Sequence, residues 1–215
     1  MDTTDGLPLP AKVQTLTLLT DIIERSPKNA FLDVRVVDPS HQAGRPVLSL
    51  CNPGDGEDLS EFSGNPKMAK NVWREKFRAP LIRALEGSLQ ASSSKTSPLL
   101  ATFQGIALER FTGAKAELAS KRLVVISDMI EHVPGEYTQY PPADLSYRRF
   151  KASTAYRKLR TDLKGADVEL FYIQREWKGR TMDSGAHIMF WLEWINDNNG
   201  HARNLPIKLQ GAGKS

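Results

Sequence analysis

The sequence contains a single cysteine, Cys51, so no disulfide bond can form within the chain. This scarcity fits a reducing compartment, in which thiols stay free. No apolar run approaches the roughly 18 residues that a membrane-spanning helix needs, and no signal peptide is visible. The sequence also lacks internal repeats and any linker long enough to divide it. We therefore expect one domain over residues 1–209 and a flexible tail over 210–215.

An excess of charge of either sign is also missing. The 29 Lys and Arg residues and 25 Asp and Glu residues give a net charge of +4. This balance permits an acidic partner but does not require nucleic acid. The hydrophobic content of 40% and charged content of 25% are ordinary for a soluble globular protein. A chain of 215 residues with this composition can bury one sizeable core.

Helical and strand patterns alternate along the chain. Apolar spacing predicts helices over about 11–24, 65–90 (kinked at Pro80), 98–112, 144–163 and 186–198. Apolar runs predict strands over 31–37, 46–50, 123–126, 166–174 and 206–209. This alternation predicts an α/β fold: a three-layer, doubly wound, mostly parallel sheet with helices on both faces. In the last helix, Trp191 and Trp194 do not share one narrow stripe, so either one is exposed or the buried face is broad.

The stretch Lys121–His132, KRLVVISDMIEH, holds the expected central strand. Leu123–Ile126 is a short apolar run rich in β-branched residues, which is typical of a strand buried on both faces. The run ends in Ser127 and Asp128. Because open parallel sheets bind ligands at the carboxyl ends of their strands, Asp128 is a candidate for chemistry. The alternative is that Asp128 only caps the turn that follows.

Sheets of this kind normally begin with a buried central strand, and here the first helix is preceded only by a polar, turn-like cluster, Asp2–Gly6. The cluster looks like the loop that follows a first strand. We expect a truncated form of a longer protein that carried its export signal or anchor upstream. A misassigned gene start, a strand from a partner and a complete chain with an irregular start are the alternatives. As it stands the chain is expected in the cytoplasm; if truncated, it is the soluble part of an exported or anchored protein.

The order of elements and three short motifs resemble the von Willebrand factor A domain. That family has an Asp-x-Ser-x-Ser motif after its first strand, a Thr or Ser before a later helix, and an Asp at the end of its central strand. The matching positions are Asp2, Thr4, Ser97 (with Thr96 beside it) and Asp128. Gly6 replaces the last hydroxyl of the first motif. The resemblance implies a Rossmann-like doubly wound fold, with a metal-ion-dependent adhesion site at the carboxyl edge of its sheet.

Carboxylates and hydroxyls suit a hard divalent cation. The resemblance implies that Asp2, Thr4, Ser97 and Asp128 hold Mg²⁺ or another divalent cation, whose open position takes a carboxylate from a partner protein. Magnesium keeps several waters, so two aspartates and two hydroxyls could suffice. The alternative is that these loops meet without metal, bridged by hydrogen bonds. Other residues expected to border the partner are Asp5, Asn52, Asp55, Thr96 and His132.

The leading hypothesis is a protein–protein interaction module, from a bacterial multiprotein system. The main alternative is a metal-dependent hydrolase or nuclease that uses the same aspartates. Enzymes of that kind usually gather three or more carboxylates. Asp2, Asp5 and Asp128 are the obvious ones at this edge, and Asp38 and Asp55 are further candidates.

A basic segment gives a further alternative. The predicted helix over 147–164 carries seven Lys and Arg residues together with Tyr147 and Tyr156. Such a helix could bind the phosphates of nucleic acid. The preferred interpretation is the solvated outer face of an α/β helix.

Overall fold

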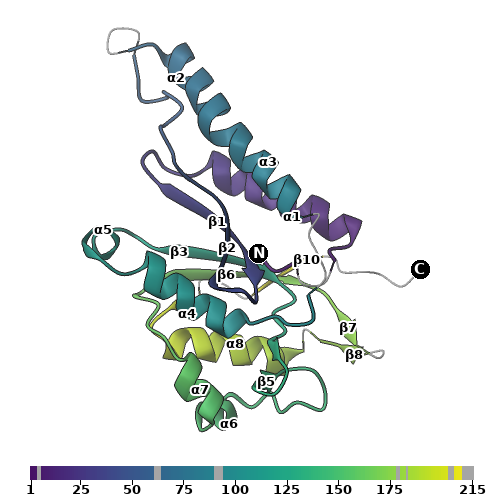
Figure 1. Ribbon diagram of the computed structural model, residues 1–215. Coiled ribbons are helices and arrows are strands. Elements are labelled where there is room, and N and C mark those ends of the chain that lie inside the picture. The colour runs from purple at the N-terminus through teal and green to yellow at the C-terminus, as the bar shows by residue number, and fades with distance from the viewer. Residues whose placement is uncertain are drawn as a thin grey trace.

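The parallel sheet is the centre of this mixed α/β protein, seen in a computed structural model that describes residues 1–3, 6–60, 64–89, 94–177, 180–182, 184–202 and 206–209 (Figure 1). Its strands β3 (Arg122–Ser127), β6 (Asp167–Ile173) and β10 (Ile207–Leu209) lie in the order β10-β6-β3. The short strand β9 (His201–Ala202) pairs with the beginning of β6. The strands predicted over 123–126, 166–174 and 206–209 are therefore confirmed.

Strands β3 and β6 carry apolar side chains on both faces, and helices cover both faces. On one face, Val125, Leu170 and Tyr172 pack in one cluster with residues of α4 (Leu99–Arg110) and α8 (Gly185–Asp197). On the other face, a second cluster contains Ile126, Phe171, Ile173 and residues of α1 (Leu9–Glu24). Both strands are consequently buried from two sides, as their continuous apolar runs predict.

The two tryptophans of α8 decide between the alternatives for its buried face. Trp191 and Trp194 are both 0% exposed. Both rings pack against Phe103 of α4, with centroid distances of 5.8 and 5.2 Å. The buried face of α8 is therefore broad, and neither tryptophan is an exposed contact.

A separate antiparallel hairpin is formed by β1 (Phe31–Asp38) and β2 (His41–Cys51). Strand β2 begins earlier than the predicted strand 46–50 because the turn is tight. In that turn Asp38 Oδ1 accepts hydrogen bonds from the Ser40 backbone N–H at 2.9 Å and its hydroxyl at 2.5 Å. The apolar side of the hairpin packs in a third cluster with α1 and α3 (Ala79–Ser88).

The predicted kinked helix over 65–90 forms as three pieces. Helix α2 (Pro66–Trp73) and α3 are joined by a five-residue π-helical turn, Arg74–Arg78. The wide turn ends with the Ala79 N–H donating to the Arg74 carbonyl, directly before Pro80. Because proline has no N–H to donate, the regular ladder is interrupted at this point.

The single helix predicted over 144–163 is wrong. The structure has two short helices instead, α6 (Tyr147–Lys151) and α7 (Thr154–Leu159). The hydroxyls of Ser146 and Ser153 each accept a backbone N–H three residues later, so each serine begins its own helix. Apolar spacing alone does not reveal that the second serine restarts the helix.

The remaining elements are short and lie outside the predicted helices and strands. They are α5 (Ala114–Glu117), the pair β4 (His132–Val133) and β5 (Tyr137–Thr138), and the pair β7 (Glu176–Trp177) and β8 (Arg180–Thr181). Among the helices of the described ranges, none is long and apolar enough to cross a membrane. The predicted tail over 210–215 lies outside the described residues.

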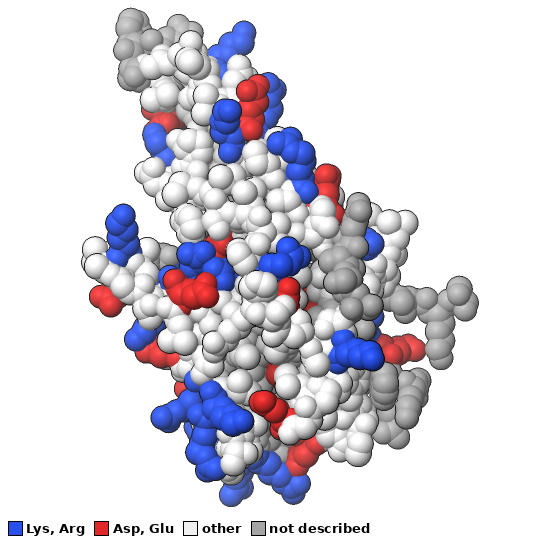
Figure 2. Space-filling view, viewed as in Figure 1, with Lys and Arg blue, Asp and Glu red and all other residues white. Residues whose placement is uncertain are grey.

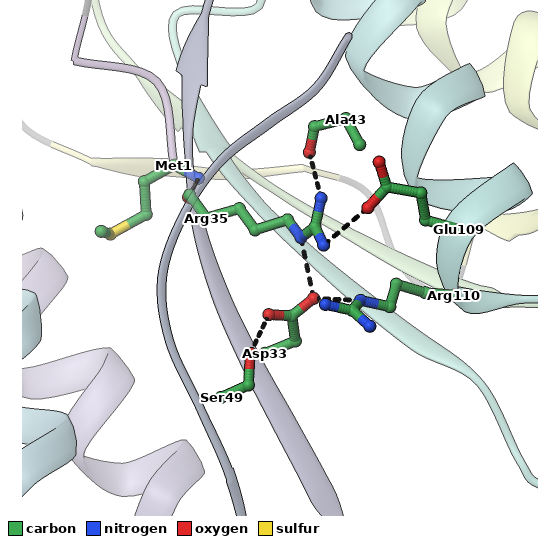
Figure 3. Close-up of polar contacts among 7 residues, drawn as sticks. All are labelled: Met1, Asp33, Arg35, Ala43, Ser49, Glu109 and Arg110. Atoms are coloured by element: carbon green, nitrogen blue, oxygen red, sulfur yellow. Dashed lines mark hydrogen bonds and ion pairs between the residues drawn. The ribbon is translucent and has the colours of Figure 1, made fainter. Parts of the chain in front are cut away.

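A buried arginine connects the hairpin to α4 (Figure 3). Arg35 is 9% exposed, and its guanidinium donates to Asp33 at 2.8 Å and to the Ala43 carbonyl at 3.0 Å. It also pairs with Glu109 of α4 at 2.8 Å. Asp33 accepts further hydrogen bonds from two side chains, Ser49 and Arg110. Because partners surround the guanidinium on several sides, the cost of its burial is offset.

The same helix touches the hairpin backbone directly. A Cβ atom added to Gly105 of α4 would lie 2.6 Å from the Ala43 nitrogen and Cα and from the Gln42 carbonyl oxygen. Only glycine therefore permits this distance between α4 and β2. Gly87 of α3, in contrast, has no heavy atom within 4 Å of its added Cβ.

We predict that Gly105→Ala lowers the free energy of unfolding by about 1–3 kcal/mol, because α4 must move away from β2. The matched variant Gly87→Ala is expected to raise it by up to about 1 kcal/mol, through helix propensity alone. Urea unfolding followed by circular dichroism measures both. Equal changes in the two variants would contradict the close packing of α4 on β2.

Candidate functional site

Residues Met1–Thr3 lie between the hairpin and the parallel sheet. The Met1 amino group donates to the Arg35 carbonyl at 2.7 Å, and the Met1 carbonyl accepts from the Val37 N–H at 2.8 Å. The Asp2 N–H donates to the Ile126 carbonyl at 2.8 Å. These contacts place Asp2 at the carboxyl ends of β3 and β6, which we call the carboxyl edge. Burial lowers the pKa of the Met1 amino group to about 6, although the Asp2 carboxylate opposes this shift.

The Asp2 carboxylate joins three segments that are far apart in the sequence. Its Oδ2 atom accepts hydrogen bonds from the hydroxyls of Ser97 at 3.0 Å and Ser127 at 2.7 Å. All three residues are buried. Asp128 follows Ser127 directly, so the structure brings Asp2, Ser97 and Asp128 to the same edge of the sheet. Thr4 and Asp5, which were also expected here, lie outside the described residues.

Asp128 has two roles in the structure. Its Oδ1 atom accepts the Ile130 N–H at 3.0 Å, which is the cap that the sequence offered as an alternative. Its Oδ2 atom pairs with Arg175 Nε at 3.0 Å, and the side chains of Asp128 and Arg175 are 6% and 24% exposed. Arg175 was missed in the sequence, although it follows β6 at the same carboxyl edge.

A serine followed by proline is typical of a capped helix start. Ser97 nevertheless does not cap α4. Pro98 is the N-cap residue and makes no side-chain cap hydrogen bond, while the Ser97 hydroxyl turns to Asp2. Glu131 caps the helix instead, because its Oε2 atom accepts the Leu100 N–H at 2.8 Å. The cap of α4 therefore comes from a residue after the central strand, and the sequence around the helix start does not predict it.

Glu131 is fully buried beside this edge, at 0% exposure. Burial raises the pKa of Glu131 to about 8, and the negative charges of Asp2 and Glu136 add to the rise. The N–H groups of Leu100 and Leu99 oppose it. Glu131 therefore keeps its proton over most of the physiological range. The sequence contains one hint of this, an acidic residue directly after the apolar pair Met129-Ile130.

A buried polar network continues from Glu131 to helix α8. The Glu131 N–H donates to Gln139 Oε1 at 3.0 Å, and the same oxygen lies 3.1 Å from His187 Nε2. Gln139 is 1% exposed and His187 is 0% exposed. The carboxyl edge is thus backed by hydrogen-bonded side chains and not by apolar packing alone.

The donor chemistry of the edge fits a hard divalent cation only in part. Asp2, Asp128 and the hydroxyls of Ser97 and Ser127 are oxygen ligands of the kind that magnesium prefers. Within the described ranges, however, no cluster of three or more His, Cys, Asp or Glu residues could hold a metal ion. A cation would therefore depend on two carboxylates and would compete with the Arg175 guanidinium for Asp128.

Of the other residues expected to border a partner, two lie near the edge and two do not. His132 exchanges backbone hydrogen bonds with Ser97 at 2.9 and 3.0 Å, and Thr96 precedes Ser97. The loop with Asn52 and Asp55 lies at the opposite end of β1 from Met1, because the Asn52 N–H donates to the Ala30 carbonyl. Antiparallel pairing returns β2 to the amino end of β1, so this loop does not join the carboxyl edge.

Basic side chains gather around α6 and α7, as Figure 2 shows. The exposed ones are Arg148, Arg149, Lys151, Arg157, Lys158 and Arg160. Arg149 pairs with Asp144, and Lys151 pairs with Asp197. The segment is broken into two helices and partly neutralised, so it does not form the single basic helix that the nucleic-acid hypothesis assumed.

Comparisons with known proteins identify no relative: the chain matches no protein-family model, no curated protein and no solved structure. The likeness to von Willebrand factor A domains therefore stays a prediction from motifs and element order.

We predict that Glu131→Gln stabilises the protein more at pH 8 than at pH 5. Between the ordinary pKa of 4.5 and the folded value of about 8, the folded state keeps a proton that the unfolded state loses. Stability of the native chain should fall as pH rises through this window, by at most about 5 kcal/mol. Glutamine removes this loss. Urea unfolding at both pH values measures the effect.

The control for this prediction is Glu86→Gln, which changes an exposed glutamate of α3 that does not act on Glu131. It should leave the pH dependence of stability unchanged. A Glu131→Gln variant whose stability follows the same pH curve as the native chain would mean that Glu131 is ionised in the folded state.

Proposed function

We propose that this protein is an interaction module of the von Willebrand factor A-like type, with a doubly wound sheet, that binds an acidic group of another protein at its carboxyl edge. The observation that carries the proposal is the pair of hydrogen bonds from Ser97 and Ser127 to the Asp2 carboxylate. These bonds gather oxygen ligands from three segments at a strand end, where open α/β sheets bind their ligands.

A divalent cation completes the proposed site. Asp2 and Asp128 supply the charge, the hydroxyls of Ser97 and Ser127 supply further oxygens, and a partner carboxylate takes an open position. In this proposal Thr4 is a further ligand of the cation and Asp5 borders the partner. The cation would replace the Arg175 guanidinium, since both neutralise Asp128 and only one can occupy the space beside its Oδ2 atom.

Arg175 therefore controls access in this proposal. Asp2 is 5% exposed and the Asp128 side chain 6%, whereas the Arg175 side chain is 24% exposed. The arginine is the member of the ion pair that reaches solvent, so movement of its side chain would open the edge. Without a cation, the same guanidinium offers a direct contact for an acidic partner.

The competing function is a metal-dependent hydrolase or nuclease with the same aspartates. Among the described residues, Glu131 is a further acid beside this edge, and its raised pKa keeps it protonated at neutral pH, so it adds no third anionic ligand. This favours binding over catalysis. Manganese-dependent cleavage of phosphoesters that disappears in Asp128→Asn would instead identify an enzyme.

We predict that Arg175→Met strengthens binding of Mg²⁺ and Mn²⁺ about tenfold, or about 1.4 kcal/mol, because the guanidinium no longer competes for Asp128. Asp128→Asn, which keeps the shape of the side chain but removes its charge, should abolish binding. Isothermal titration calorimetry of both variants and of the native chain with each metal measures these affinities.

Asp162→Asn is the matched control, since Asp162 is a surface aspartate that pairs with Lys164 and Asn199 away from the edge. It should leave the metal affinity unchanged. If folded Arg175→Met gives only the heat of dilution at millimolar metal, the edge is not a cation site.

A further inference from the structure

Met1 makes the backbone contacts of a residue in a parallel strand. Its amino group donates to the Arg35 carbonyl, and its carbonyl accepts from the Val37 N–H. A residue in a parallel ladder bonds in this way to the two neighbours of its partner. Met1 is therefore in parallel register with Val36 of β1.

Asp2 continues the pattern on the other side. Its N–H donates to the Ile126 carbonyl, which places Asp2 in parallel register with Ser127 of β3. Residues 1 and 2 thus run between β1 and β3, which are two strand spacings apart at this point, about 10 Å. Figure 1 shows the N-terminus between the hairpin and the parallel sheet.

We propose that the facing edges of β1 and β3 hold a further parallel β-strand, of which Met1 and Asp2 are the last two residues. In the described part of the chain, β1 pairs along its length only with β2 and β3 only with β6. A strand between them would join the hairpin and the parallel sheet into one sheet, in the order β2-β1-new strand-β3-β6-β10.

The two edges agree on the length of the missing part. Val36 lies five residues after the start of β1 at Phe31, and Ser127 lies five residues after the start of β3 at Arg122. Since Met1 is in register with Val36, a strand that reaches the start of β1 needs about five residues ahead of Met1. Since Asp2 is in register with Ser127, a strand that reaches the start of β3 needs about four.

The side chains along the two edges indicate the chemistry of the strand. Leu32, Val34, Leu123 and Val124 are only half-buried, although each is packed at the border of an apolar cluster. A strand with apolar side chains on both faces would cover them, so Val, Ile and Leu are the fitting residues.

The occupant is joined to Met1 by a peptide bond in this proposal. The Met1 nitrogen lies 2.7 Å from the Arg35 carbonyl oxygen, in the place of a strand amide. A separate chain entering the same edges would have to end against this amino group. In a continuous chain, the same nitrogen is an ordinary peptide amide of the strand.

The test is to extend the full chain by Leu-Val-Val-Ile-Val ahead of Met1 and to follow amide hydrogen exchange by NMR. Backbone groups of every second residue along a strand point to the same side. Because the Arg35 and Ile126 carbonyls bond to Met1 and Asp2, the amides of Asp33 and Val124, two residues earlier, point toward the new strand. Their exchange should slow at least tenfold in the extended chain, and the melting temperature should rise.

The control extension has the same length, with proline at its second and fourth positions, so that it cannot pair as a strand. It should leave the exchange of both amides unchanged. Equal exchange in the apolar and proline extensions would overturn the proposal. Protection by the free five-residue peptide but not by the fused one would also overturn it, because the occupant would then be a strand from a partner.

Discussion

The backbone pairing of Met1 and Asp2 with two different strands is the contact on which the arrangement of this protein depends. The hairpin and the parallel sheet share no strand-to-strand ladder among the described residues. Through Arg35 and Val37 on one side and Ile126 on the other, the first two residues connect them. The same pairing fixes where the Asp2 carboxylate lies. The architecture and the candidate site therefore share one physical cause.

Three acidic residues near this junction are accommodated in three different ways. Asp2 accepts hydrogen bonds from two hydroxyls, Asp128 pairs with Arg175, and Glu131 keeps its proton. Like charges close together and shielded from water cannot all remain ionised without compensation. Asp128 is the acid whose compensation comes from a partly exposed side chain. A cation or an acidic partner can change the charge balance of the edge most readily by acting on that arginine.

Sequence patterns predict the buried strands well because their signal is local. The run Leu123–Ile126 is apolar and β-branched, and it forms β3 with the boundaries shifted by one residue at each end. The helix predicted over 144–163 fails because Ser153 caps a new helix, which the spacing of apolar residues does not report. Local patterns do not carry strand direction either. The loop with Asn52 and Asp55 was therefore expected at the carboxyl edge, whereas it lies beside the amino end of β1.

The candidate site was predictable in its positions but not in its chemistry. Asp2, Ser97 and Asp128 follow or precede elements that the α/β pattern brings to one edge, so their meeting follows from topology. Arg175 and Glu131 escaped notice because their partners are distant in sequence. Arg175 pairs with a residue 47 positions away, and Glu131 caps a helix 31 positions away. Charge compensation between distant segments emerges only when the chain is folded.

Helix α4 gives the carboxyl edge a rigid support. Its beginning is held by Glu131 and by the backbone pairing of Ser97 with His132. Its last turn carries Glu109 and Arg110 into the network around Arg35, and Gly105 lies against the backbone of β2. A ligand that displaced Ser97 would have to move a helix that is fixed at both ends and in the middle. Ligating side chains that a rigid element holds in place favour binding without rearrangement of the protein. In the proposed binding site, the adjustable part is then the partly exposed side chain of Arg175, and selectivity would follow from what can compete with its guanidinium for Asp128.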